Sequence, residues 1–157
     1  MGNWTRKDWI RMIVRDYHPD DLEALCSLMD DLGYPSTLEK LRNRMDRIQL
    51  NPMYFTFVAE IDEKVVGMIG VRQLYSYEHD EIVTQISALV TKREYQGRGI
   101  GKRLVRYVEN WAVANDSTVI VLTSGIKENR VSAHEFYRSV GFEVTGYRFV
   151  KKLHNTM

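Results

Sequence analysis

Six residues that include three glycines, Q-G-R-G-I-G at positions 96–101, have the types and spacing of an anion-binding loop. An apolar strand pattern precedes them at positions 82–91, and an amphipathic helix pattern follows at positions 104–113. The first N–H groups of a helix have no partner inside the helix, and the helix macrodipole places partial positive charge around them. Glycines let an anion approach because they carry no Cβ atom. The segment therefore predicts a phosphate site.

Two familiar phosphate-binding patterns do not fit this loop. The dinucleotide pattern G-x-G-x-x-G, read from Gly97, requires a third glycine where Lys102 stands. The nucleoside triphosphate pattern G-x-x-x-x-G-K-[ST], aligned on Gly101 and Lys102, meets Gln96 in place of its first glycine. Both classes of nucleotide-binding protein are thereby excluded, and the pattern that remains is Q-x-x-G-x-G.

This pattern resembles the loop that binds the pyrophosphate of coenzyme A in the GNAT superfamily of N-acetyltransferases, [QR]-x-x-G-x-[GA]. A second segment, A-H-E-F-Y-R-S-V-G-F at positions 133–142, is similar to the A-x-x-x-Y-x-x-x-G-F signature of that family. One helix pattern and one strand pattern separate the two motifs, as in the family. The resemblance implies an acetyltransferase that moves an acetyl group from acetyl-CoA directly to a primary amine of a small molecule or peptide, without a metal.

The resemblance also assigns a cofactor site. Backbone groups at the end of the central strand are expected to pair with pantetheine as if it were another strand, and the amides of the loop are expected to surround the pyrophosphate. The residues expected to bind acetyl-CoA are Leu89, Val90, Thr91, Gln96, Gly97, Arg98, Gly99, Ile100, Gly101, Lys102 and Asn129. Asn129 stands four residues before Ala133, whereas the commoner family spacing of three selects Arg130, so both are candidates.

Tyr137 is the expected catalytic residue. It matches the family tyrosine that donates a proton to the leaving thiolate, and a phenol with a pKa of about 10 is protonated at neutral pH. The alternative role is a core aromatic beside Phe136. No general base can be assigned, because Gln85 and Ser87 occupy the strand positions where some relatives have a carboxylate. Glu81, or a water held near Ser87, is a candidate acceptor of the amine proton.

The missing base leaves open an alternative function, a non-catalytic acyl-CoA-binding regulatory module. In the family fold, the acceptor amine lies near the connection between the first two helices, here residues 32–35, and we expect the loop at residues 75–80 to lie opposite. These segments and their flanks contribute three tyrosines and several acids, a combination that suits a cationic amine. The acids are Asp30, Asp31, Glu78, Asp80 and Glu81.

Composition is ordinary for a water-soluble domain. The 22 lysines and arginines nearly balance the 21 acids, so neither nucleic acid nor an anionic membrane is an expected partner. No apolar run reaches membrane-spanning length, and no signal peptide pattern opens the chain, so we expect a cytoplasmic protein. We expect one domain over residues 11–153, an extension at 1–10 and a tail at 154–157. A homodimer is compatible with the sequence.

Periodicity predicts the elements that position these residues. Strands are expected at 12–16, 54–61, 65–74, 82–91 and 118–123, with a final pair at 143–147 and 148–153. Helices are expected from a start at 18–21 to Gly33, from the capping pattern at 36–39 to 48, along the segment after the glycine loop, and at 131–140. This order predicts an α/β layered protein with the GNAT fold, a mixed central sheet with helices on both faces.

Overall fold

A computed structural model describes residues 11–154 of the chain. The expected extension at 1–10 and residues 155–157 of the expected tail lie outside the described residues. The chain forms two compact units, of which the first ends at Leu122 and the second begins at Thr123.

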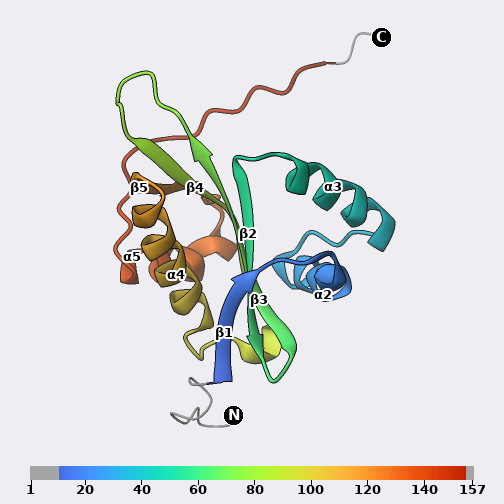
Figure 1. The fold of residues 1–157 in the computed structure, drawn as a ribbon. Helices are drawn as coiled ribbons and strands as arrows, with labels where there is room; N and C mark the ends of the chain where they lie inside the picture. Colours follow the sequence, from blue (N-terminus) through green and yellow to red (C-terminus); the bar gives the residue numbers. More distant parts are fainter. Residues whose placement is uncertain (1–10, 155–157) are drawn as a thin grey trace. The chain divides into compact units, whose positions relative to one another are not determined.

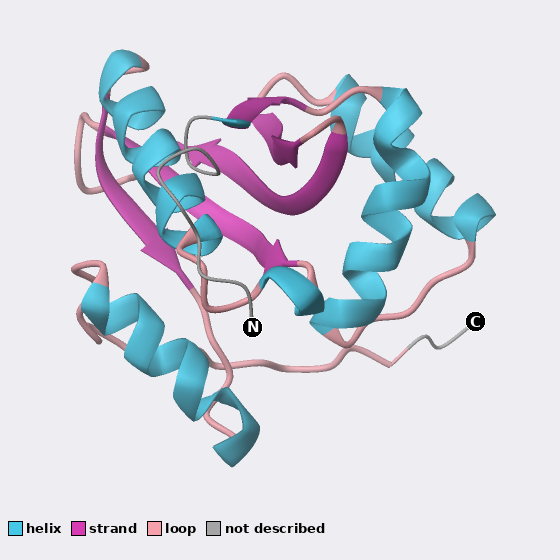
Figure 2. Ribbon diagram, turned by 90° about the horizontal axis from the view of Figure 1, so that it is seen from below, coloured by secondary structure: helices cyan, strands magenta, loops and turns pink. Residues whose placement is uncertain are grey.

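The first unit is built on one five-stranded sheet with the order β1-β2-β3-β4-β5. Strands β1 to β4 are antiparallel to their neighbours, whereas β4 and β5 are parallel. The sheet is twisted, as Figure 2 shows. The strands are β1 (Met12–Asp16), β2 (Tyr54–Ile61), β3 (Lys64–Leu74), β4 (Ile82–Thr91) and β5 (Ser117–Leu122). The expected mixed sheet is thus confirmed.

Helices cover both faces of this sheet (Figure 1). On one face, α2 (Leu22–Leu32) and α3 (Leu38–Leu50) pack against apolar side chains of the central strands, and we call this the α2–α3 face. The residues buried there include Leu25, Leu28, Leu41, Met45, Val58, Met68 and Val90. Among the described helices, none is both long and apolar enough to cross a membrane.

The opposite face packs against α4 (Ile100–Ala114), the helix that follows the glycine loop. The Phe57 ring meets the Tyr107 ring edge-on at 5.0 Å between centroids, and Phe55 lies 4.6 Å from Trp111. Where β3 passes the first turn of α4, Gly67 leaves the space that a side chain would fill: a Cβ there would lie 3.2 Å from Ile100 Cγ2. The absence of a side chain at Gly67 therefore lets α4 approach the sheet.

The helix ends follow their sequence signals. Thr37 caps α3 by accepting a hydrogen bond from the Lys40 N–H at 3.2 Å. Gly33 closes α2 in the left-handed conformation with φ of 98°, which glycine adopts without strain. The expected ends of both helices are confirmed to within two residues. The expected start of the first helix at 18–21 is instead the 3₁₀ helix η1 (Pro19–Asp21), which leads into α2, and the cap of α3 is Thr37, one residue after the start of the predicted capping pattern.

A bulge interrupts the ladder between β3 and β4. Gly70 pairs with Ala88 and Val71 with Ile86, so Ser87 is an additional residue in β4. The bulge moves the side-chain alternation by one residue. Gln85 and Ala88 consequently project from the same face of the sheet, although their separation of three positions in a regular strand would place them on opposite faces.

The second unit contains the short 3₁₀ helix η3 (Glu128–Arg130) and the helix α5 (Val131–Ser139). The strand pair expected at 143–147 and 148–153 is wrong, because the described residues after Phe142 adopt no regular secondary structure. Side chains that the pattern would bury, such as Tyr147 and Phe149, are more than 90% exposed. An alternating pattern stabilises a strand only when a neighbouring strand completes its hydrogen bonds, and no strand pairs with this described segment.

Candidate functional site

The parallel ladder between β4 and β5 covers only part of β4. It ends at the pair Ile86 and Leu122, whereas β4 continues to Thr91. Residues 87–91 therefore have β3 on one side and no paired strand on the other side within the described structure. An extended ligand could add to this open edge through backbone hydrogen bonds. The expected pantetheine-binding residues Leu89, Val90 and Thr91 all lie in this segment.

The glycine loop leads directly into α4. Gly97 and Gly99 have positive φ angles of 78° and 80°, conformations that glycine adopts readily. Gly99 is the N-cap of α4 and offers no side-chain cap. The first bond of the helix is donated by the Arg103 N–H to the Gly99 carbonyl at 3.0 Å. The N–H groups of Gly101 and Lys102 come earlier in the helix and have no acceptor within it.

Several contacts hold this loop against the end of β4. The Gln96 side chain donates to the Thr91 carbonyl at 3.4 Å, so Gln96 links the loop to the strand. The Arg93 N–H donates to Asp31 Oδ2 at 3.0 Å, which ties the loop to α2. The guanidinium of Arg98 lies 5.1 Å from the centre of the Tyr95 ring. Asp31, one of the acids expected beside the acceptor, therefore accepts a hydrogen bond from the backbone segment that precedes the loop.

These features fit coenzyme A. No neighbouring atom lies within 4 Å of the position that a Cβ on Gly97 would take, so an anion can approach the loop backbone there. The unpartnered amides at the start of α4 suit a pyrophosphate, and the open edge of β4 suits an extended amide-containing chain. The residues that would hold the cofactor in the first unit are therefore 89–91 and 96–102.

Tyr137 and Asn129 belong to the second unit. Burial raises the pKa of Tyr137 above its ordinary value of 10.0, and the charge of nearby Arg130 partly opposes this effect. The phenol is therefore protonated at neutral pH, as an acid must be. Its ring packs edge-on against Phe136 and Phe142 at 5.6 and 6.0 Å. Asn129 is exposed. The acid role of Tyr137 and the cofactor role of Asn129 stay predictions.

His134 is engaged within its own unit. Its Nε2 atom lies 2.6 Å from the Gly125 carbonyl oxygen. A carbonyl only accepts hydrogen bonds, so Nε2 carries the proton and donates it. This nitrogen is not available as a general base in this arrangement.

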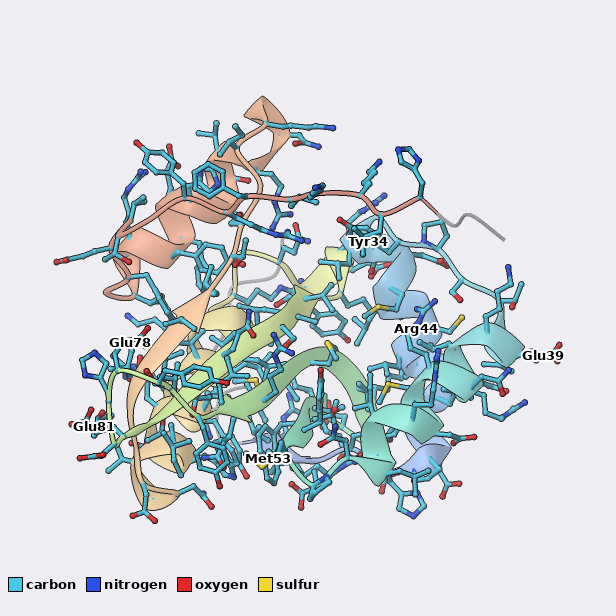
Figure 3. All side chains as sticks on the ribbon, turned by 90° about the horizontal axis from the view of Figure 1, so that it is seen from above. Tyr34, Glu39, Arg44, Met53, Glu78 and Glu81 are labelled. Atoms are coloured by element: carbon cyan, nitrogen blue, oxygen red, sulfur yellow. The ribbon has the colours of Figure 1, made fainter. Side chains whose placement is uncertain are left out.

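The strand positions considered for a base hold neutral groups. Gln85 accepts a hydrogen bond from Arg72 Nε at 2.6 Å, and Ser87 is exposed at the bulge. Glu81, the residue before β4, is exposed and points away from the molecule in Figure 3. Strand β4 therefore offers no carboxylate as a general base.

The two segments expected beside the acceptor lie on different sides of the first unit. Figure 3 shows Tyr34 and Arg44 on the side of α2 and α3, whereas Glu78 and Glu81 lie on the loop at the far side. A hydrogen bond from Ser76 holds the pKa of Glu78 below its ordinary value, and its side chain is exposed. The acids of the loop therefore do not gather around Tyr34.

Two notable residues were not identified from the sequence. Arg72 lies half-buried on the α2–α3 face, in a strand that is otherwise mostly apolar. A charge inside the strand, eight positions after Lys64 at its start, was the available signal. The second is Gly67, for which the available signal was a glycine inside a strand, a position that often marks the close approach of another element.

The comparisons with known proteins concern the family and the fold. The Acetyltransferase (GNAT) family model matches residues 15–142. The aminoalkylphosphonate N-acetyltransferase of Salmonella typhimurium is 27% identical over 149 residues, covering 85% of this chain and 96% of that protein. Human N-acetyltransferase 8 is 36% identical over 93 residues, which are 59% of this chain and 40% of that protein. The chain thus spans less than half the length of this human relative.

Solved structures show the same fold. A GNAT family acetyltransferase of Staphylococcus aureus superposes with a TM-score of 0.79 and 29% identity, covering 91% of this chain and 99% of that one. An aminoglycoside N-acetyltransferase in complex with CoA superposes with a TM-score of 0.78 at 16% identity, covering 92% of this chain and 95% of the other. The family match extends over most of the sequence, from β1 to the end of the second motif, and the chain therefore belongs to the acetyltransferase (GNAT) family.

Proposed function

We propose that the chain transfers an acetyl group from acetyl-CoA to a primary amine of a small molecule or peptide. The observation that carries this proposal is that a short segment, residues 92–98, joins the open edge of β4 to the uncapped start of α4. One feature accepts an extended chain and the other accepts a diphosphate, and they are adjacent in sequence. Acetyl-CoA, when bound, would supply the activated acyl group.

The chain's own residues would contribute position and protons. Residues 89–91 would orient the donor along β4, and the amides at the start of α4 would donate hydrogen bonds to its phosphates. Tyr137, in the second unit, would supply the proton that the leaving sulfur takes up as the C–S bond breaks and the C–N bond forms. Because Gln85 and Ser87 cannot ionise at neutral pH, the proton of the attacking amine passes to water.

The relatives support a small amine as the acceptor. The Salmonella relative is named for aminoalkylphosphonate. Human N-acetylaspartate synthetase is 36% identical to this chain over 90 residues, which are 57% of this chain and 28% of the human protein. Both names specify amines that carry an acidic group. Aminoglycoside acetyltransferases share the fold at lower identity.

Calorimetric titration with acetyl-CoA, followed by a panel of amines with free thiol as the readout, tests the proposal. We expect binding at micromolar concentrations and release of coenzyme A above the hydrolysis background with at least one amine. Binding without amine-dependent thiol release would favour the acyl-CoA-binding module instead. Absence of binding at high micromolar concentrations would overturn both functions.

A further inference from the structure

Arg72 on β3 has only neutral partners. Its Nε donates to Gln85 Oε1 at 2.6 Å, and its Nη1 donates to the Tyr54 hydroxyl at 3.4 Å. An arginine has five N–H donors, so these two bonds leave three for other partners. Among the described residues, no carboxylate lies within ion-pair distance of this guanidinium. A half-buried guanidinium with three remaining donors and no internal carboxylate can take a bound anion as a further partner.

A second arginine on the same face shows the contrast. Arg15 on β1 donates through Nε to Glu60 at 2.6 Å, and through both terminal nitrogens to Asp21 at 2.8 and 2.9 Å. Two carboxylates thus neutralise it within the fold. Arg15 is thus an ion-paired arginine of the fold, whereas Arg72 bonds only the neutral side chains of Gln85 and Tyr54 on the neighbouring strands.

Arg72 lies close to the expected site of chemistry. It pairs across the ladder with Gln85, just before the bulge at Ser87, whereas the edge expected to pair with pantetheine begins after the bulge at Leu89. Ile69, the residue opposite Leu89, is three positions from Arg72, which corresponds to about 10 Å along a strand. An acceptor a few carbon atoms long could therefore reach from Arg72 toward the bulge.

The sheet carries only small side chains between the Arg72 guanidinium and the bulge. The row of paired residues next to Tyr54, Arg72 and Gln85 on this face is made of Thr56, Gly70 and Ala88. A Cβ added at Gly70 would meet its nearest neighbours only at 3.8 and 3.9 Å. No bulky side chain of this row stands between the guanidinium and the bulge.

We propose that Arg72 binds an anionic group, a carboxylate or a phosphonate, on the acceptor amine. The planar guanidinium matches two oxygens of such a group at once, which a lysine ammonium cannot do. The acceptor would then be a short amine with an acidic end, whose amine faces the bulge. This inference rests on the proposed acetyltransferase function and names the class of its acceptor.

The test compares amines that differ in their acidic group. Free-thiol release at saturating acetyl-CoA would be measured with 2-aminoethylphosphonate, aspartate and propylamine, for the wild type and for Arg72→Met, Arg72→Lys and Gln85→Glu. Arg106→Met, which removes an exposed charge from α4 on the other face, is the matched control. We expect the wild type to prefer one of the two anionic amines, and the preferred one identifies the anion.

Arg72→Met should raise KM for the preferred anionic amine by about 10- to 100-fold, the worth of a charge-assisted hydrogen bond, and leave propylamine nearly unchanged. The KM of Arg72→Lys for the anionic amine should lie between those of the wild type and Arg72→Met. Gln85→Glu keeps the arginine but gives it an internal carboxylate, so it should also weaken affinity for the anionic amine even if Arg72→Met folds poorly. Arg106→Met should behave as the wild type.

Equal effects of Arg72→Met on anionic and neutral amines, or a wild-type preference for propylamine, would overturn the inference. If no amine releases thiol, the proposed function fails, and calorimetric titration of 2-aminoethylphosphonate and aspartate still decides the inference. Binding to the wild type that is lost in Arg72→Met supports an anion site at Arg72. Absence of binding to the wild type, or equal binding to both, refutes it.

Discussion

Gly67 is where β3 approaches the first turn of α4 most closely, and replacing it with alanine tests how the sheet positions the glycine loop. The added Cβ would lie 3.2 Å from Ile100 Cγ2, from Leu104 Cδ1 and from the Val90 carbonyl oxygen. All three contacts are tighter than ordinary van der Waals contact. Ile100 and Leu104 are fully buried, and the carbonyl belongs to the β3–β4 ladder, so little room exists for these atoms to move.

The expected magnitude follows from two opposing effects. Overpacking a buried site typically costs about 1–3 kcal/mol, whereas replacing glycine with alanine restricts the unfolded chain and gains about 0.4–1 kcal/mol. The free energy of unfolding should therefore fall by about 1 kcal/mol, which lowers Tm by about 2–4 °C for a domain of this size. The overpacking is relieved most readily by a small outward shift of the start of α4, which carries the amides of the proposed phosphate site.

Gly70→Ala is the matched control, because Gly70 lies in the same strand and its added Cβ would have only ordinary contacts. We expect this variant to be as stable as the wild type or slightly more stable. Urea unfolding of both variants gives the stability difference, and calorimetry gives the acetyl-CoA affinity. Gly67→Ala should weaken acetyl-CoA binding several-fold, whereas Gly70→Ala should not.

Two results would refute this reasoning. Equal stability of the two variants would show that the contact between β3 and α4 is looser than the distances indicate. A destabilised Gly67→Ala with unchanged acetyl-CoA affinity would show that the start of α4 does not contribute to the phosphate site.

Three further predictions concern other parts of the chain. Gly97→Ala and Gly33→Ala, both at positive φ, should each cost about 1–2 kcal/mol in urea unfolding, but only Gly97→Ala should weaken acetyl-CoA binding. A hydrogen bond from Arg15 lowers the pKa of Asp21 in the folded protein, so the ion pair stabilises the fold fully above the unfolded pKa of about 3.9. This stabilisation is lost as the pH falls through the lower folded pKa. The free energy of unfolding of Asp21→Asn should therefore depend less on pH in acid than that of the wild type, and equal pH dependence of the two proteins would contradict this. Tyr137→Phe should lower turnover by about 100-fold while sparing acetyl-CoA affinity, and unchanged turnover under rate-limiting chemistry would remove the acid role.

Local signals in the sequence were sufficient for most of the first unit. The apolar runs of β2, β3 and β4 and the apolar stripes of α2 and α3 depend on residues close in sequence, as do the Thr37 cap and the Gly33 ending. The glycine loop was recognisable for the same reason, because strand, loop and helix are consecutive. What these signals could not supply was the partner of each element.

The failures concern partners that are distant in sequence. Residues 143–153 alternate like a strand, but that pattern does not state whether a neighbouring strand pairs with them. The close approach at Gly67 involves a helix that begins more than thirty residues later, at Ile100. The bond between Arg72 and Gln85 depends on the register of two strands joined by a loop, and it could not be read from either strand alone.

The bulge at Ser87 explains how one strand serves both the core and the candidate site. In a regular strand, Gln85 and Val90 would project from opposite faces, because five positions separate them. The additional residue allows Val90 to pack with Met68 in the core beneath α2, while Gln85 holds Arg72 on the same face farther along. Deleting Ser87 would force β4 to lose one of these two arrangements, since a shift of one residue turns each side chain to the other face. The irregularity in the ladder is therefore the feature that lets β4 hold a buried apolar segment beside the open edge and a polar segment beside the proposed acceptor.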